Sequence, residues 1–214
     1  MLDGVTLLDN CTLPDFDRRE ILRYAGNKGE ADETLSTLLE ECLTECAAVF
    51  TPRLCYRVFD VGGFYKLFDK ERQSKLLQTR LEGCDKVLIF AATVGIGIDR
   101  LIRKYAAVSP VKALVFQAIG AERIEALCDS FCEELKREYG CITGRFSAGY
   151  GDFPLSAQTA FFQTLDCARG IGLTLTDSLL MTPTKSVTAA VGLGGKQGKI
   201  GCAACEKKDC DYKK

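Results

Sequence analysis

The run KVLIFAAT, at residues 86–93, is the feature that most constrains the fold of this chain. It is almost wholly apolar and contains β-branched residues, whereas a strand with one face in water would alternate apolar and polar positions. The run therefore predicts a central strand covered on both faces. A chain of 214 residues with 47% hydrophobic and 27% charged residues is long enough, and ordinary enough in composition, to build a globular core around it.

Helical apolar periodicity surrounds this strand on both sides. We expect helices at residues 17–26 with Asp17 as the N-cap, 31–50, 71–84, 93–105, 111–139, and 157–170 with Ser156 as the N-cap. We also expect a hairpin within residues 55–68 that turns at Gly62 and Gly63, and late strands within 171–181 and 185–193. Strict βαβ alternation is absent, so the pattern predicts an α+β domain with a mostly antiparallel, twisted sheet and flanking helices.

Charge and apolar content exclude several classes of protein. Lys and Arg number 28 against 29 for Asp and Glu, and no basic run is present to neutralise phosphates, so we expect no nucleic-acid partner. No apolar run approaches the roughly 20 residues that span a bilayer, and the first residues do not resemble a secretory signal. We therefore expect a cytoplasmic protein with no membrane partner.

Histidine is absent from the chain, whereas cysteine occurs 12 times. The absence of histidine excludes histidine bases, nucleophilic triads and metal ligands, so any acid–base chemistry would use other side chains. Free cysteines are expected in a reducing compartment, where they behave as small buried hydrophobes. We interpret eight of them as core residues: Cys42, Cys46, Cys55, Cys84, Cys128, Cys132, Cys141 and Cys167.

A Gly-containing segment, residues 194–199, separates a cysteine-rich tail from the rest of the chain. We therefore divide the chain into a domain at 1–193 and a linker with tail at 194–214. Cys202, Cys205 and Cys210 have the spacing C-x2-C-x4-C, which can hold zinc or part of an iron–sulfur cluster if a fourth ligand comes from elsewhere. A redox-active dithiol and a disordered tail are the alternatives.

Two glycine-containing segments could approach a ligand. TVGIG, at residues 93–97, leaves a strand and enters a helix, but it lacks the dinucleotide-binding spacing, so we interpret it as a packing turn. RFSAGYGDFPLS, at residues 145–156, contains Arg145, whose fixed fork of donors matches a carboxylate. Gly149 and Gly151 would let the main chain approach a ligand, and Tyr150 offers a flat surface. The alternative for this loop is a solvated turn.

An ordered set of motifs follows this loop. Arg145, Gly149 and Tyr150 precede a helix and the Leu-Thr-Asp-Ser segment at residues 175–178. Met181, Pro183, Ser186 and Val187 come next. In this order the segment resembles the activation (reactivation) domain of cobalamin-dependent methionine synthase, and weaker similarity extends over most of residues 17–193.

The resemblance implies a site for S-adenosylmethionine, the methyl donor that restores an oxidised cobalamin with an electron from a flavodoxin-type reductant. In the resemblance, Arg145 holds the methionine carboxylate and Glu125 meets the positive end of the ligand. Tyr150 also faces the corrin ring. The other expected ligand contacts are Ser147, Ala148 and Gly149 in the loop, and the backbone at Leu179 and Leu180 on the adenosine side.

This chain departs from the family pattern in three respects. Gly-Tyr-Pro is replaced by Gly-Tyr-Gly, with the proline at Pro154, so we expect a more mobile loop. Asp15 and Asp17 match the family's amino-terminal aspartate by position only. No cobalamin-binding module is recognisable, so we expect the corrinoid to arrive on a partner protein.

The sequence thus predicts a free-standing activation protein that binds S-adenosylmethionine and docks on a separate corrinoid methionine synthase. Its electron donor would be flavodoxin-like or its own cysteine tail. The alternatives are a reactivator of another corrinoid methyltransferase, and a non-catalytic metal-binding or interaction protein that retains the fold.

Overall fold

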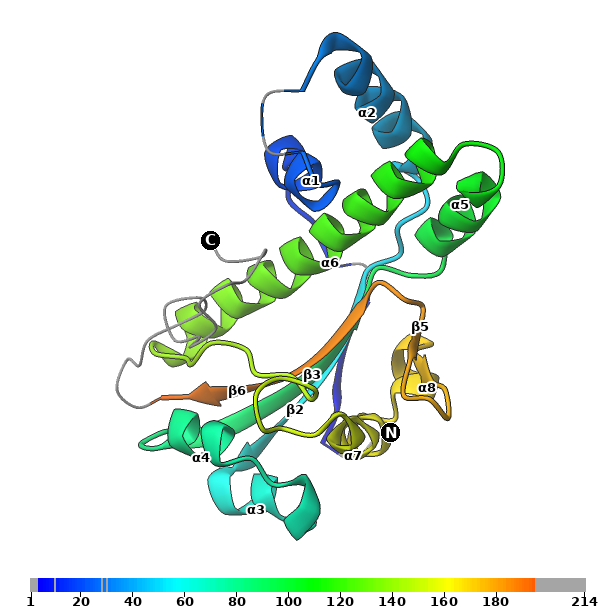
Figure 1. Cartoon of the computed structure of the whole chain (residues 1–214). Coiled ribbons are helices and arrows are strands. Elements are labelled where there is room, and N and C mark those ends of the chain that lie inside the picture. Colours follow the sequence, from blue (N-terminus) through cyan, green and yellow to red (C-terminus); the bar gives the residue numbers. More distant parts are fainter. Residues whose placement is uncertain (1–3, 10, 28, 30, 195–214) are drawn as a thin grey trace.

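The computed structural model describes residues 4–9, 11–27, 29 and 31–194. Its centre is a four-stranded antiparallel sheet in the order β1–β2–β3–β6 (Figure 1). The strands are β1 (Thr6–Asp9), β2 (Arg53–Asp60), β3 (Lys86–Thr93) and β6 (Ser186–Leu193). The short strands β4 (Thr174–Leu175) and β5 (Met181–Thr182) form a separate hairpin. The fold is therefore α+β with an antiparallel sheet, as the sequence predicted.

Strand β3 is the central strand that the KVLIFAAT run predicted. It pairs over its full length with β2 and with β6. Its side chains alternate between two hydrophobic clusters, with Leu88 and Phe90 in one and Val87 and Ile89 in the other. All four are fully buried, because helices cover both faces of the sheet.

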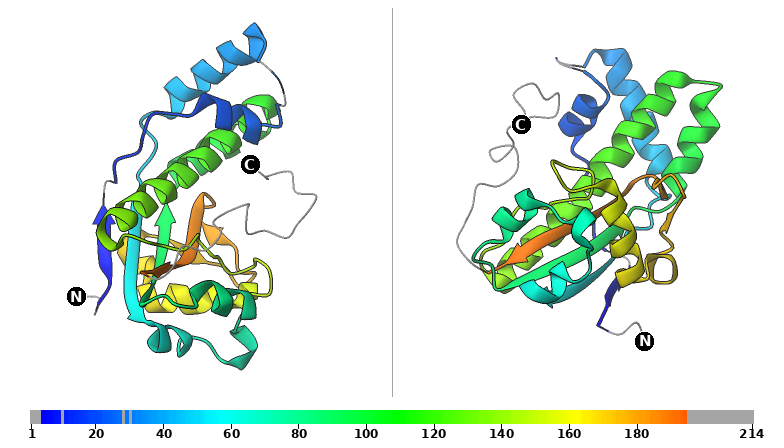
Figure 2. Two further views of the ribbon diagram at one scale, coloured as in Figure 1. Left: turned by 90° about the vertical axis from the view of Figure 1, so that its left-hand side faces the viewer. Right: turned by 60° about the horizontal axis from the view of Figure 1, so that its bottom comes forward.

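One face of the sheet carries four helices, and Figure 2 shows this layer separated from the second layer by the sheet. They are α1 (Arg18–Tyr24), α2 (Glu33–Cys46), α5 (Gly97–Ala106) and α6 (Pro110–Tyr139). Helix α6 has 30 residues and runs across the sheet as one continuous element. Gly120 lies within this helix without interrupting it. A Cβ atom at this position would lie 2.9 Å from the side chain of Lys185, so the glycine leaves room for that side chain to pack against the helix.

The opposite face carries α3 (Val61–Tyr65), α4 (Lys75–Leu81), α7 (Gln158–Leu165) and α8 (Cys167–Ile171). Its core is aromatic: the ring centroid of Phe68 lies 5.2 Å from that of Phe64 and 5.4 Å from that of Phe153. These edge-on contacts anchor Phe153, and therefore the loop that contains it, in the core.

Aspartates cap the first two helices, and Asp17 is the N-cap that the sequence predicted for α1. Its carboxylate accepts hydrogen bonds from the backbone N–H groups of Arg19 and Glu20, each at 3.0 Å. Asp32 caps α2 in the same way by accepting from Leu35 at 2.7 Å. Such caps satisfy N–H groups that have no partner within the helix.

The predicted hairpin at Gly62 and Gly63 is wrong. The chain leaves β2 and enters α3 directly, because the carboxylate of Asp60 accepts a hydrogen bond from the Gly63 N–H at 2.7 Å and caps the helix. Strand β2 instead pairs with β1 on one side and β3 on the other. The glycine pair therefore occupies a helix, where the hydrogen bond that the preceding aspartate accepts outweighs the preference of glycine for turns.

The predicted single helix after Ser156 is also wrong. A short 3-10 turn, Leu155–Ala157, precedes α7. The carbonyl oxygen of Ser156 accepts a hydrogen bond from the Thr159 hydroxyl, and the Ser156 side chain does not cap the helix. Asp166, with φ 46°, then breaks the helix into α7 and α8. In the predicted strand at 171–181, only Thr174–Leu175 and the last residue lie in strands, and a loop joins the two.

The TVGIG segment is a packing turn, as predicted. A side chain at Gly97 would overlap the carbonyl oxygen of Val49, and Gly95 adopts a φ of 88° against Thr51. All eight cysteines interpreted as core residues are free thiols. Five are buried, namely Cys42, Cys46, Cys55, Cys128 and Cys167, and three are half-buried, namely Cys84, Cys132 and Cys141. Across the described ranges, no helix is both long and apolar enough to cross a bilayer.

Candidate functional site

The segment that leads to Arg145 is fixed along the outer edge of β6. Phe146 and Ala190 exchange two backbone hydrogen bonds of 2.9 Å, and Thr143 donates its N–H to the carbonyl oxygen of Gly192 at 2.9 Å. Gly192 in turn donates to the hydroxyl of Thr143 at 2.8 Å. The segment therefore behaves as an irregular fifth strand, and it holds the backbone of Arg145 in one place.

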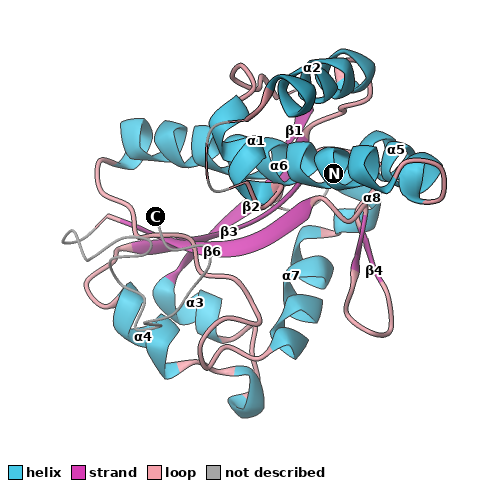
Figure 3. Cartoon of the chain, turned by 45° about the horizontal axis from the view of Figure 1, so that its top comes forward, coloured by secondary structure: helices cyan, strands magenta, loops and turns pink. Residues whose placement is uncertain are grey.

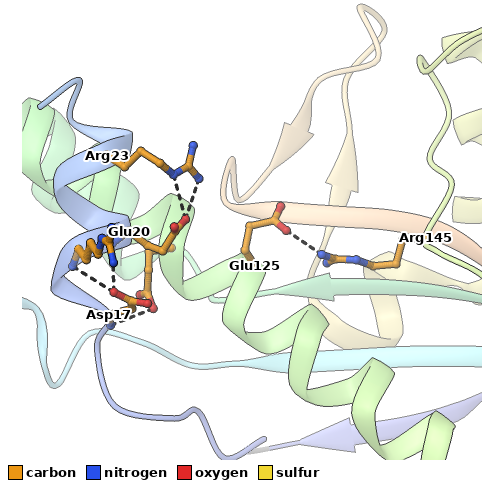
Figure 4. A network of polar contacts seen from close by, with 7 residues as sticks. Asp17, Glu20, Arg23, Glu125 and Arg145 are labelled. Atoms are coloured by element: carbon orange, nitrogen blue, oxygen red, sulfur yellow. Dashed lines mark hydrogen bonds and ion pairs between the residues drawn. The ribbon is translucent and has the colours of Figure 1, made fainter. Parts of the chain in front are cut away.

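Arg145 contacts two carboxylates of α6. Its Nη2 atom lies 2.8 Å from Oε2 of Glu125 and 2.8 Å from Oδ1 of Asp129. Figure 4 shows the Glu125 side chain pointing from the helix toward the guanidinium. The structure thus brings Arg145 and Glu125 together, and it adds Asp129, which the sequence analysis missed. Its signal was a spacing of four residues from Glu125, which places both acids on one helix face.

The charge of this cluster is −1, since two carboxylates surround one guanidinium. Only 23% of the Arg145 side chain is exposed, whereas 64% of Asp129 is exposed. Both carboxylate contacts use Nη2, and a guanidinium carries three further N–H donors on Nε and Nη1. The Cys128 thiol also lies within hydrogen-bonding reach of this guanidinium. The cluster can therefore bind a ligand that has one carboxylate and more positive than negative charge.

Two thiols of α6 lie beside Arg145. Burial raises the pKa of Cys132 to about 11, and the positive charge of Arg145 lowers it only in part. Burial also raises the pKa of Cys128, again against the effect of Arg145. Both thiols are consequently protonated and neutral at physiological pH, so they do not act as anionic partners of the guanidinium.

The Gly-Tyr loop forms a compact turn over residues 147–153. Tyr150 donates its N–H to the carbonyl oxygen of Ser147 at 3.3 Å, and Gly149 and Phe153 are joined by a 2.8 Å backbone hydrogen bond. Gly149 has a φ of 92° and Gly151 a φ of 57°, and a proline at 151 could not adopt that angle. The ring of Tyr150 is 68% exposed.

The exposure of each residue in this turn decides whether its backbone or its side chain could contact a ligand. Ala148 is only 7% exposed and packs in the aromatic core, so a ligand would meet its backbone rather than its methyl group. Ser147 is half-buried beside it. Gly149 is exposed and has no side chain to exclude a ligand.

Leu179 and Leu180 lie at the tip of the β4–β5 hairpin, which projects beside α7 and α8 (Figure 3). The tip is tightly bonded: the N–H of Leu179 donates to the carbonyl oxygen of Thr176 at 2.9 Å, and that of Leu180 to the Thr176 hydroxyl at 3.0 Å. Leu179 adopts a φ of 62°, which is uncommon for a leucine. The Leu180 side chain is 65% exposed.

The hairpin is connected to the opposite layer through Asp99, a further residue that the sequence analysis did not select. Its Oδ1 atom accepts hydrogen bonds from the N–H of Thr184 at 3.1 Å and from the Thr184 hydroxyl. Thr184 directly precedes Lys185 and β6, so Asp99 fixes the return of the hairpin to the sheet. Ser186 pairs with Thr93 at the start of β6, four residues before Ala190.

Ala190, which pairs with the residue after Arg145, and Ser186, where the chain returns from the hairpin into the sheet, lie four residues apart on β6, about 13 Å at the usual rise per residue.

Comparison with known proteins identifies the family. The model of the family described as "Vitamin B12 dependent methionine synthase, activation domain" matches residues 75–214. This chain belongs to that family. Of the solved structures, one described as the crystal structure of the MetH reactivation domain bound to AdoHcy has a TM-score of 0.63 at 15% sequence identity. The alignment covers 95% of this chain and 82% of that one. No curated protein matches.

The activation-domain match includes every residue that the sequence analysis placed at the ligand, from Glu125 to Leu180. It begins after α1 and α2, so it does not cover Asp15 or Asp17. At 15% identity, the structural likeness establishes the fold, and it extends over the amino-terminal helices as well.

In this member of the activation-domain family, a buried ion pair of α6 fixes the segment that precedes α1, residues 14–17, which we call the amino-terminal arm. Arg123 and Glu122 of α6 contact each other, Arg123 donates to the carbonyl oxygen of Asp15 at 3.0 Å, and Glu122 accepts from the N–H of Asp17 at 3.2 Å. The carboxylate of Asp17 is already engaged as the cap of α1. Figure 4 shows Asp17 beside Glu20 and Arg23, across α6 from Arg145.

Metal ligands were expected only in the tail. Cys202, Cys205 and Cys210 lie outside the described residues, so their arrangement remains a prediction. Within the described ranges, no group of three or more Cys, Asp, Glu or His side chains is placed to hold a metal ion.

Proposed function

We propose that this activation-domain protein binds S-adenosylmethionine at the Arg145 cluster. The observation that carries the proposal is that the Nη2 atom of Arg145 contacts two carboxylates at 2.8 Å on the surface of a chain of this family. S-adenosylmethionine carries a carboxylate, an ammonium group and a sulfonium group, hence a net charge of +1. A cluster with one cation and two anions is complementary to that pattern.

Each residue has a role in this proposal. The Nε and Nη1 groups of Arg145 bind the methionine carboxylate, and Glu125 and Asp129 face the ammonium and sulfonium charges. The backbone of residues 147–150 lines the middle of the ligand. Leu179 and Leu180, in the loop that joins β4 to β5, contact the adenosine end. Tyr150, 68% exposed, faces the corrin ring of the partner.

Bound S-adenosylmethionine supplies a methyl group to cobalamin carried by a separate methionine synthase, with an electron from a flavodoxin-like donor. The residues of this chain bind and orient the ligand, and alignment is the chief requirement of methyl transfer. No general base is needed, which agrees with a chain without histidine. In this proposal the protein is cytoplasmic and has no activity until the corrinoid partner docks.

Calorimetric titration of S-adenosylmethionine into the purified protein tests the site. Arg145→Ala should abolish binding, whereas Arg53→Ala should not, because Arg53 pairs with Asp9 at the opposite edge of the sheet. Retained binding by Arg145→Ala would contradict the assignment. The titration of the wild type is repeated in the presence of a corrinoid methionine synthase. If S-adenosylmethionine binds in neither experiment, the proposed function is contradicted.

We propose further that Cys202, Cys205 and Cys210 hold zinc or part of an iron–sulfur cluster, with one ligand from elsewhere. Protein purified anaerobically should then contain iron or zinc, and a variant with all three cysteines changed to serine should not. Metal-free wild-type protein would end this proposal without affecting the S-adenosylmethionine site.

A further inference from the structure

Asp152 joins the Gly-Tyr turn to helix α4 across a long stretch of sequence. Its Oδ2 atom accepts a hydrogen bond from the backbone N–H of Lys75 at 2.8 Å and lies 3.3 Å from the N–H of Leu76. Its Oδ1 atom accepts from the hydroxyl of Ser74. The Ser74 hydroxyl in turn accepts from the N–H of Leu77 at 3.0 Å. Together they satisfy the first N–H groups of α4.

These contacts keep Asp152 ionised. The hydrogen bond from Ser74 is the largest cause that lowers its pKa, and the N–H groups of Leu76 and Lys75 lower it further. The carboxylate also lies at the positive end of the helix dipole, which favours an anion. The connection is therefore in place throughout the physiological pH range.

We propose that Asp152 is a positioning residue that fixes Tyr150 by fastening the 147–153 turn to α4. Tyr150 lies between two glycines with positive φ, which leave its backbone free to rotate unless something outside the turn restrains it. On one side the turn is restrained by Phe153, whose ring is buried. The hydrogen bonds of Gly149 and Tyr150 with Phe153 and Ser147 are internal and do not hold the exposed part against the rest of the protein.

Asp152 supplies that external restraint next to Tyr150. The fastening also brings Gly151 against α4, where the position of a Cβ atom would lie 3.5 Å from the Leu76 side chain. At residue 151 φ is 57°, an angle that proline cannot adopt, so proline could not rigidify the turn at this position.

The link to ligand binding rests on the proposed function, but the fastening can be tested without it. The chain contains no tryptophan, so Tyr150→Trp introduces a single tryptophan reporter at the tip of the turn, which can be excited selectively at wavelengths that the tyrosines do not absorb. In that background, Asp152→Ala should lower the fluorescence anisotropy of the reporter, because the ring gains motion on the nanosecond scale. Asp152→Asn should retain most of the anisotropy, since asparagine also caps helices.

The matched control is Asp32→Ala, which removes a capping aspartate from α2, away from the turn. It should lower stability without changing the anisotropy. An unchanged anisotropy in Asp152→Ala, with the fold retained by circular dichroism, would overturn the proposal. The same loss of anisotropy in Asp32→Ala would also overturn it, because the effect would then be general loosening.

Titration of S-adenosylmethionine into Asp152→Ala with Tyr150 intact is the second measurement. We expect about two- to tenfold weaker binding, because ligand binding must then order the turn, at about the cost of one immobilised side chain. Unchanged affinity would overturn the link between the fastening and the ligand. If the wild type itself does not bind the ligand, the proposed function fails, while the anisotropy still decides the role of Asp152.

Discussion

Asp129 places its Oδ1 atom 2.8 Å from Nη2 of Arg145, the same nitrogen that Glu125 contacts one helical turn earlier. Removing one of these two negative charges should lower the affinity for a ligand with net positive charge more than the affinity for a ligand with no net charge. We therefore expect Asp129→Asn to bind S-adenosylmethionine about two- to fivefold more weakly, the range for one exposed ion pair, with less change for S-adenosylhomocysteine, which keeps the ammonium and the carboxylate but lacks the sulfonium charge. Calorimetry with both ligands measures the ratio.

Glu133→Gln is the matched control for this prediction, because Glu133 lies one turn further along α6 and pairs with Lys136 rather than with Arg145. It should leave both affinities unchanged. Equal weakening of the binding of both ligands by Asp129→Asn would show that Asp129 does not interact with the sulfonium charge.

The buried pair of Glu122 and Arg123 should dominate the stability of the amino-terminal arm. Their side chains are 3–6% exposed, and breaking such a pair leaves one charge without compensation. Arg123→Met should therefore lower the free energy of unfolding by about 3–5 kcal/mol, whereas Glu122→Leu combined with Arg123→Met should cost much less. Urea unfolding measures both. A double variant as unstable as the single one would contradict this explanation.

Gly97 should not tolerate a side chain. Alanine there would overlap the carbonyl oxygen of Val49, and backbone cannot move aside as a flexible side chain can. We expect Gly97→Ala to lower the unfolding free energy by about 1–3 kcal/mol despite the better helix propensity of alanine. Gly29→Ala, which meets nothing within 4 Å, should change it by less than about 0.5 kcal/mol.

Buried thiols should make the protein sensitive to high pH. Burial raises the pKa of Cys42 to about 11 and that of Cys46 to about 12, from an ordinary value of 9.0. Below pH 9 these thiols are protonated in both the folded and the unfolded chain, so their contribution to stability is complete. Above pH 9 only the unfolded chain loses the protons, and each thiol then removes about 1.4 kcal/mol of unfolding free energy per pH unit.

The slope of unfolding free energy against pH between 9 and 11 measures this effect. Cys46→Ala should make the slope shallower. Leu39→Ala, which opens a cavity in the same hydrophobic cluster without removing a thiol, should lower stability but keep the slope. An identical slope in the wild type and Cys46→Ala would contradict the prediction.

Local sequence patterns predicted the structure correctly where the pattern within one helix or strand is enough to define that element. The unbroken apolar run of β3 required cover on both faces, and Asp17 and the apolar stripe of α6 located two helices. They were insufficient at Gly62 and Gly63, where the outcome depends on Asp60 rather than on the glycines. Asp166 in a left-handed conformation could not be read from sequence either, because its φ is imposed by the packing of α7 and α8.

For the candidate site, the family motif located Arg145, Tyr150 and their neighbours but no contact between distant segments. Asp129 became visible only when the Arg145 segment was placed beside α6. Asp152 lies 77 residues from Lys75 in sequence, and nothing in either local sequence indicates that they meet. Contacts of this kind depend on the whole fold, and a single chain offers no pattern that reveals them.

The segment that carries Arg145 also covers the outer edge of β6, through its hydrogen bonds with Ala190 and Gly192. An uncovered strand edge is a template on which other chains can add strands and aggregate. Substitutions that release residues 141–146 should therefore make the protein precipitate, and they should also abolish the binding proposed at Arg145. Solubility and the proposed ligand binding would then depend on the same six residues.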